Sequence, residues 1–239
     1  MPDASNFHWW RTVFYLIPAV ALYTIVLGTA SLFSTLFDPT GNFAHRCARA
    51  WATLILKTTG VRVRVSGLEH LEPGRSYVFA ANHQSIYDIP IVFTSIPFQL
   101  RIVAKESLGR IPFMGWHLQR AGHLLVNRRN PGADIVQKMR RLVGESSSLI
   151  VFPEGTRSID GKVGRFKKGS FVVAIDAGLP VVPVSIQGSR HVMKKGQLMV
   201  CPGEVVLTIH PPLPTARVPR EKVLPFAERV RQIVAQPAG

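Results

Sequence analysis

The stretch ANHQSIYDIP, residues 81–90, contains the clearest candidate for chemistry, a histidine and an aspartate five positions apart between two apolar runs. A carboxylate that accepts the proton of one imidazole nitrogen fixes the tautomer of the ring. The other nitrogen is then free to take a proton from a hydroxyl group. His83 and Asp88 are therefore a candidate general base and its orienting carboxylate. A structural capping pair is the alternative that this spacing leaves open.

Other catalytic sites fit the sequence less well. The chain has no G-x-S-x-G nucleophile elbow, so Ser85 is interpreted as a turn residue. It also has no H-E-x-x-H motif, and its other histidines are scattered, so we expect no metal ion and no cofactor. Cys47 and Cys201 have no C-x-x-C spacing and are expected to be reduced structural thiols.

The stretch VFPEGTRS, residues 151–158, contains a second candidate. A buried strand that ends in Pro153 is followed by backbone donors and by Arg157, whose guanidinium suits bidentate binding of phosphate. A plain β-turn is the alternative. Four further cations follow: Lys162, Arg165, Lys167 and Lys168. We interpret each of the three lysines as solvated surface.

Secondary-structure elements around these residues must hold them in place. From residue 61 onward, short β-rich runs alternate with helical patterns. The runs are VRVRVSG, YVFAA, RIVAK, HLLV, SLIVF, VVPVSI and EVVLTIH. Helices are expected after Asn130 and Pro131, in KGSFVVAIDAG and in REKVLPFAERVRQIVAQ. This order predicts an α/β domain with a mixed, largely buried sheet flanked by helices.

The same layout places the histidine and the aspartate in a loop. Pro90 predicts that the helix after the run YVFA begins near Asp88, which leaves residues 82–87 as a tight connection between strand and helix. On one helix, five positions amount to a rotation of about 500°, which would point the two side chains apart. A folded connection is therefore needed to join His83 to Asp88.

The N-terminal region predicts a membrane segment. Residues 12–37 carry no charge over 26 positions, and about 20 helical residues cross a bilayer core. The alternatives are a signal peptide and a kinked or re-entrant helical pair that uses Pro18 and Gly28. The helix expected in FAHRCARAWATLILKTTG is amphipathic, and it lies either at the membrane interface or packed on the domain. We assign residues 1–58 to membrane anchoring and residues 59–239 to the α/β domain.

The net charge of the chain narrows the choice of binding partner. The chain of 239 residues has a net charge of +15 and 46% apolar residues, which favours an anionic partner such as a membrane surface, phosphate groups or nucleic acid. Most aromatic residues lie in apolar runs instead of basic strands, which argues against nucleic acid. The cations that follow the apolar segment outnumber those before it, so we expect the α/β domain to face the cytoplasm, at the inner membrane in a bacterium.

The blocks NHQSIYD, FPEGTRS and VPVSI, in this order and spacing, resemble those of the glycerolipid acyltransferases typified by 1-acylglycerol-3-phosphate acyltransferase. The resemblance covers about residues 60–210 and includes KESLGRIPFMGW. One block departs from the pattern, because GHLLVNR keeps Gly122 and Arg128 but has Asn127 where the family usually has an acid. This difference bears on the identity of the acceptor.

The resemblance implies transfer of a fatty acyl group from acyl-CoA or acyl carrier protein to the sn-2 hydroxyl of 1-acylglycerol-3-phosphate, forming phosphatidic acid in phospholipid biosynthesis. His83 would deprotonate the hydroxyl and Asp88 would orient the ring. The residues implied in substrate binding are Lys105, Arg128, Glu154, Gly155, Thr156 and Arg157. Partners would be the lysophospholipid, the acyl donor and the bilayer. Glycerol-3-phosphate or another lysolipid as acceptor, a His-Asp hydrolase and a non-catalytic basic membrane scaffold remain alternatives.

Overall fold

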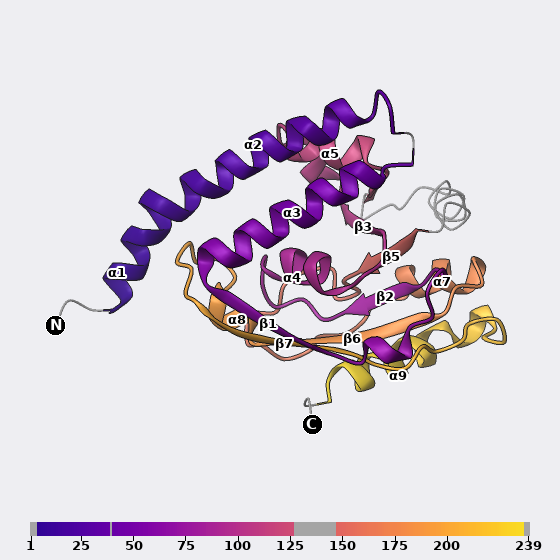
Figure 1. Ribbon diagram of the computed structural model, residues 1–239. Coiled ribbons are helices and arrows are strands. Elements are labelled where there is room, and N and C mark those ends of the chain that lie inside the picture. The colour runs from indigo at the N-terminus through magenta and orange to yellow at the C-terminus, as the bar shows by residue number, and fades with distance from the viewer. Residues whose placement is uncertain (1–3, 39, 127–146, 237–239) are drawn as a thin grey trace.

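The computed structural model describes residues 4–38, 40–126 and 147–236 of the chain, and shows an α/β fold around one seven-stranded sheet (Figure 1). The strand order is β1-β7-β6-β2-β5-β3-β4. The strands are β1 (Val61–Ser66), β2 (Val78–Ala81), β3 (Leu100–Lys105), β4 (Leu124–Val126), β5 (Ser148–Val151), β6 (Val181–Gln187) and β7 (Gly203–Ile209). All seven β-rich runs of the sequence are therefore strands.

The sheet is mixed, as predicted. The neighbours from β6 through β2, β5 and β3 to β4 are parallel, whereas β7 runs antiparallel to β6 and parallel to β1. Strands β2 and β5 are buried at every residue, which explains why they read as continuous apolar runs without alternation. Because these central strands are parallel, their carboxyl ends meet at one edge of the sheet.

Helices cover both faces of the sheet (Figure 1). On one face lie α3 (Asn42–Thr59) and α4 (Asp88–Ser95), and on the other lie α7 (Gly169–Asp176) and α9 (Val223–Val234). Shorter helices are α5 (Met114–Arg120) and α8 (Ser189–Val192), with 3-10 turns η2 (Leu68–His70), η3 (Glu106–Arg110) and η4 (Arg220–Lys222). The helix expected after Asn130 lies outside the described residues.

The N-terminal helix is continuous through α1 (Ala4–Arg11), the π-helical turn η1 (Thr12–Leu16) and α2 (Ile17–Ser34). Pro18 lies in the first turn of α2, and the helix continues through Gly28, so residues 12–37 do not form the kinked pair considered from the sequence. Instead, α2 packs along α3 (Figure 1). Trp51 Nε1 on α3 donates a hydrogen bond to Thr24 Oγ1 on α2 at 3.0 Å. In the described part of the chain, one helix, Asn6–Ser34, is long enough and apolar enough to cross a membrane.

The amphipathic helix α3 is packed on the domain. Its apolar side chains Ala52, Ile55 and Leu56 are buried in the core that α4 and the sheet share. By contrast, α2 exposes apolar side chains, with Leu22 58% and Phe33 63% accessible. Of the two positions considered for α3, the structure therefore favours packing on the domain, while α2 has an apolar face that no described residue covers.

Candidate active site

The histidine and aspartate lie together in the loop that follows β2. His83 Nδ1 is 2.8 Å from Asp88 Oδ2, and the same oxygen accepts backbone N–H bonds from Gln84 at 2.7 Å and Ser85 at 2.9 Å. Asp88 is the first residue of α4, as predicted, and makes no cap to the N–H groups of that helix. The carboxylate therefore shapes the loop and holds the histidine, which is a different arrangement from a helix-capping pair.

The orientation of the imidazole follows from this hydrogen bond. An ionised carboxylate only accepts hydrogen bonds, so Nδ1 of His83 is the donor and Nε2 is left as the basic nitrogen. The ring also stacks on Phe152, with the ring centroids 4.3 Å apart. Asp88 is fully buried, whereas the His83 side chain keeps 16% of its surface exposed and can be reached by a substrate. The geometry fits a general base.

Glu154 joins the two candidate loops. Because β2 and β5 are adjacent and parallel, the loops after them meet at the same edge of the sheet. Glu154 Oε1 accepts the N–H of His83 at 2.8 Å, and Oε2 accepts the N–H of Gly164 at 3.0 Å. Burial raises the pKa of this carboxyl, and the two backbone donors oppose that shift. Ser158 N donates to His83 O at 2.7 Å, which adds a second link between the loops.

The turn at residues 155–157 is surrounded by cations. Gly155 has a φ of +72°, and a Cβ atom there would lie 2.9 Å from Lys167 Nζ. Lys195 Nζ donates to Thr156 Oγ1 at 3.0 Å and to the carbonyl oxygen of Arg157 at 2.9 Å. Lys167 is exposed, as the sequence suggested, and its Nζ also lies beside the turn, whereas Lys195 had no sequence signal. The arrangement suits an anion.

The remaining predicted binding residues are less fully described. Lys105 ends β3, which pairs in parallel with β5, so its backbone lies at the same edge of the sheet as the two loops. Arg128, with its neighbour Asn127, lies outside the described residues. Ser85 is a turn residue as expected, since it is fully buried and its hydroxyl donates to Met193 O at 2.8 Å.

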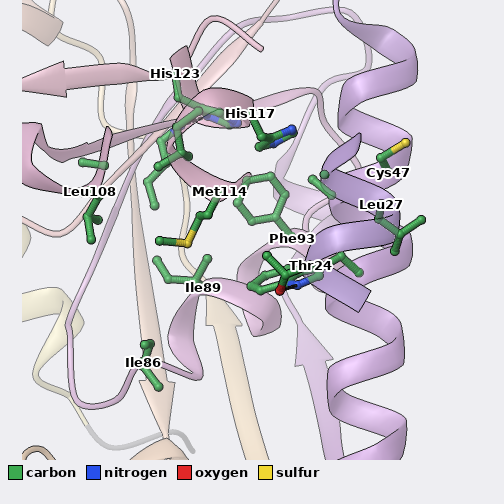
Figure 2. Close-up of a pocket in the computed structure, with 16 residues that line it drawn as sticks. Thr24, Leu27, Cys47, Ile86, Ile89, Phe93, Leu108, Met114, His117 and His123 are labelled. Atoms are coloured by element: carbon green, nitrogen blue, oxygen red, sulfur yellow. Dashed lines mark hydrogen bonds between the residues drawn. The ribbon is translucent and has the colours of Figure 1, made fainter. Parts of the chain in front are cut away.

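An apolar cavity of about 190 Å³ lies beside the loop that contains the dyad (Figure 2). Ile86 from the dyad loop lines one end, and His117 and His123 line the other. The wall between them comes from helices far apart in the sequence, including Leu27 on α2 and Ala48 on α3. Such a cavity takes an apolar ligand. No single stretch of sequence could reveal it, because four separate helices build it.

The two histidines at the far end of the cavity are uncharged. Burial, with a contribution from Arg101, lowers the pKa of His117 to about 4, and burial lowers that of His123 well below its usual value. His117 Nδ1 and Ser31 Oγ are 2.6 Å apart, which links α5 to α2. His123 Nδ1 accepts the N–H of Ile102 at 3.0 Å. These rings serve packing and closure of the cavity.

Known proteins are similar to this chain in sequence and, in one solved structure, in fold. Residues 62–187 match the family model described as Acyltransferase. A 1-acyl-sn-glycerol-3-phosphate acyltransferase of Chlamydomonas reinhardtii is 37% identical over 179 residues, which are 73% of this chain and 52% of that protein. One of Saccharomyces cerevisiae is 31% identical over 189 residues, which are 77% of this chain and 62% of that protein.

A solved structure matches over nearly the whole length. The crystal structure of the 1-acyl-sn-glycerophosphate (LPA) acyltransferase PlsC from Thermotoga maritima has a TM-score of 0.81 and 27% sequence identity, and the match covers 97% of both chains. The chain spans between half and two thirds of the length of the two curated relatives.

Proposed function

Since the chain belongs to the acyltransferase family, we propose that it transfers a fatty acyl group from a thioester to the sn-2 hydroxyl of 1-acylglycerol-3-phosphate, forming phosphatidic acid. One observation carries the proposal. The loop that contains the His83–Asp88 pair is hydrogen-bonded to the loop of the 155–157 turn, which has Lys167 and Lys195 beside it, and the same dyad loop contributes Ile86 to the apolar cavity. A substrate that binds both the cationic turn and the apolar cavity has a phosphate and an acyl chain, and it reacts at a hydroxyl group between them.

The chemistry requires one proton carrier and no covalent enzyme intermediate. His83 Nε2 takes the proton of the acceptor hydroxyl while the oxygen attacks the thioester carbonyl carbon. The tetrahedral intermediate then expels the thiolate, and His83 returns the proton to the sulfur. Asp88 remains ionised and stabilises the imidazolium between the two steps. The buried Ser85 hydroxyl, already bonded to Met193 O, takes no part.

Phosphate recognition is assigned to the 155–157 turn and its neighbours. The guanidinium of Arg157, with Lys105 and Arg128, binds the acceptor phosphate, since guanidinium and ammonium groups pair well with a dianion. Gly155 and Thr156 give the turn its shape, and Glu154 ties it to the backbone of His83. The phosphate is thus held at a fixed place relative to the base.

The apolar cavity is assigned to an acyl chain. Ile86 and Ile89 lie on either side of Asp88 in the sequence and line the cavity, so a chain bound there has its head group next to the dyad. The donor is acyl-CoA or acyl-acyl carrier protein. Both donors are anionic, and the net charge of +15 favours their approach.

Membrane attachment is assigned to the N-terminal helix. The helix Asn6–Ser34 has the length and hydropathy of a span, and α2 exposes an apolar face. Within residues 1–58, assigned to anchoring, the helix Asn6–Ser34 would contact the lipid and α3 would attach it to the core of the catalytic part, residues 59–239, which faces the cytoplasm, where acyl thioesters are made. The acceptor is a membrane lipid, so an anchored enzyme meets it in the bilayer.

A product assay tests the proposal. The purified full-length protein in liposomes is given oleoyl-CoA and, separately, 1-acylglycerol-3-phosphate, glycerol-3-phosphate, lyso-ornithine lipid or no acceptor, and the products are identified by mass spectrometry. We expect phosphatidic acid and free thiol in equal amounts from the first acceptor. Thioester hydrolysis at the same rate without acceptor would instead indicate a hydrolase, and exclusive use of another lysolipid would reassign the acceptor.

A further inference from the structure

Residues 193–200, called here the clamp segment, follow α8 and contact three functional parts of the molecule. At one end, Met193 O accepts the hydroxyl hydrogen of Ser85 in the dyad loop at 2.8 Å. At the other end, Val200 N donates to Thr12 Oγ1 at 3.0 Å and Val200 O accepts from Arg11 Nη2 at 3.1 Å. The clamp segment is therefore fixed to both the dyad loop and the N-terminal helix.

Lys195 lies between these two attachments and reaches the turn at residues 155–157. An ammonium group has three hydrogens to donate, and the contacts at Thr156 Oγ1 and the Arg157 carbonyl use two of them. Both partners are neutral oxygens. Within the described residues, no ion pair joins Lys195 to a carboxylate, so its positive charge stays uncompensated beside the turn.

Three cationic residues lie in or beside this turn. Arg157 belongs to the turn, Lys195 binds its backbone, and Lys167 lies against Gly155. Glu154, the nearest acid in the sequence, is already used by the N–H groups of His83 and Gly164. Such an arrangement becomes favourable when a multiply charged anion binds, because each cation then gains attraction.

We propose that Lys195 is a positioning residue of the acceptor-phosphate site. It holds Thr156 and the backbone of Arg157 in place, and its charge strengthens the binding of a phosphate dianion. The clamp segment is pinned at both ends, so Lys195 is held in place before the ligand arrives, which lowers the entropic cost of binding. This inference rests on the proposed function of the same site and adds a residue that lies outside the blocks of the family resemblance.

Three variants of the full-length protein test the inference. Lys195→Met removes the charge and both hydrogen bonds, Lys195→Arg keeps the charge, and Lys194→Met removes the same charge from the exposed neighbouring residue. We expect Lys195→Met to raise KM for 1-acylglycerol-3-phosphate about tenfold while kcat and the KM for acyl-CoA change less than threefold. Lys195→Arg should recover part of the affinity, and Lys194→Met should resemble the wild type.

A binding assay separates this inference from the proposed function. Inorganic phosphate should raise the melting temperature of the wild-type protein, and the half-saturating phosphate concentration should be about tenfold higher for Lys195→Met. If the wild type makes no phosphatidic acid, the proposed function fails, and the phosphate titration still decides the role of Lys195. Equal phosphate affinity in Lys195→Met and Lys194→Met, or equal losses in kcat and in the KM of both substrates, would overturn the inference.

Discussion

At the scale of residues, one oxygen of Asp88 organises the dyad. Oδ2 binds His83 Nδ1 and two backbone N–H groups, so the loop and the ring are fixed by the same atom. The sequence predicted that the two side chains meet in a folded connection, because Pro90 indicates where α4 begins, but the spacing alone left a capping pair open and the catalytic roles came from the family resemblance. The link from Glu154 to the backbone of His83 could not be predicted, since it depends on the parallel pairing of β2 with β5.

Replacement of Arg157 tests the assignment of the phosphate. Arg157→Ala should raise KM for 1-acylglycerol-3-phosphate by roughly tenfold to a hundredfold with a smaller effect on kcat, because the guanidinium binds a group present in both ground and transition states. Steady-state kinetics with acceptor and donor varied separately measure this split. Arg165→Ala is the matched control, since Arg165 is exposed and follows the same loop. Equal effects of the two substitutions would refute the assignment.

At the scale of elements, helices α2, α3, α4 and α5 line the cavity together with residues of β3 and η3. Periodicity in the sequence predicts that α3 has an apolar face, but it does not show which side chains leave a space between the helices. The cavity depends on where α2 crosses α3 and on the link from Ser31 to His117. These are tertiary contacts, so the cavity could be found only in the structure.

The buried His117 predicts a pH dependence of stability. Its pKa is about 4 in the folded protein against 6.5 for an exposed histidine, so folding favours the neutral ring. The unfolded chain binds more protons between these two pH values, and the stability present above pH 6.5 is lost as the pH falls toward 4. The loss for His117 alone is about 2 kcal/mol by a pH of about 5.

Melting temperatures in detergent measured at neutral and acid pH check this expectation. Wild type should lose several degrees on acidification, and His117→Gln should lose less, because glutamine does not titrate. His191→Gln is the control, as His191 is exposed. An unchanged acid sensitivity in His117→Gln would show that the ring is not the group that must stay neutral.

At the scale of the whole molecule, the N-terminal helix both extends from the domain and closes it. It exposes apolar side chains such as Leu22 and Phe33, while Thr24, Leu27 and Gly28 line the cavity. The sequence predicted the apolar segment from its length. The contact of Arg11 and Thr12 with Val200 was not predicted, because those residues lie 188 positions or more apart in the chain.

Removal of residues 1–40 tests membrane attachment. The cut leaves α3 in place, because Ala52, Ile55 and Leu56 belong to the core. We expect the shortened protein to leave carbonate-washed membranes and to stop floating with liposomes on a density gradient. Flotation separates lipid binding from aggregation. A second variant, Leu22→Glu with Val26→Glu, keeps the helix and charges its exposed face, and it should also weaken flotation. Full flotation of both variants would contradict the anchoring role.

The central claim is that the His83 ring deprotonates the acceptor hydroxyl, and one measurement tests it most directly. Single-turnover transfer from acyl-CoA to 1-acylglycerol-3-phosphate is compared between wild type and His83→Ala in liposomes, with His70→Ala as a control outside the site. The account predicts a rate lower by about 10² to 10⁴ in His83→Ala, with an unchanged melting temperature and unchanged affinity for the acceptor. A correctly folded His83→Ala protein that forms phosphatidic acid at the wild-type rate would contradict it.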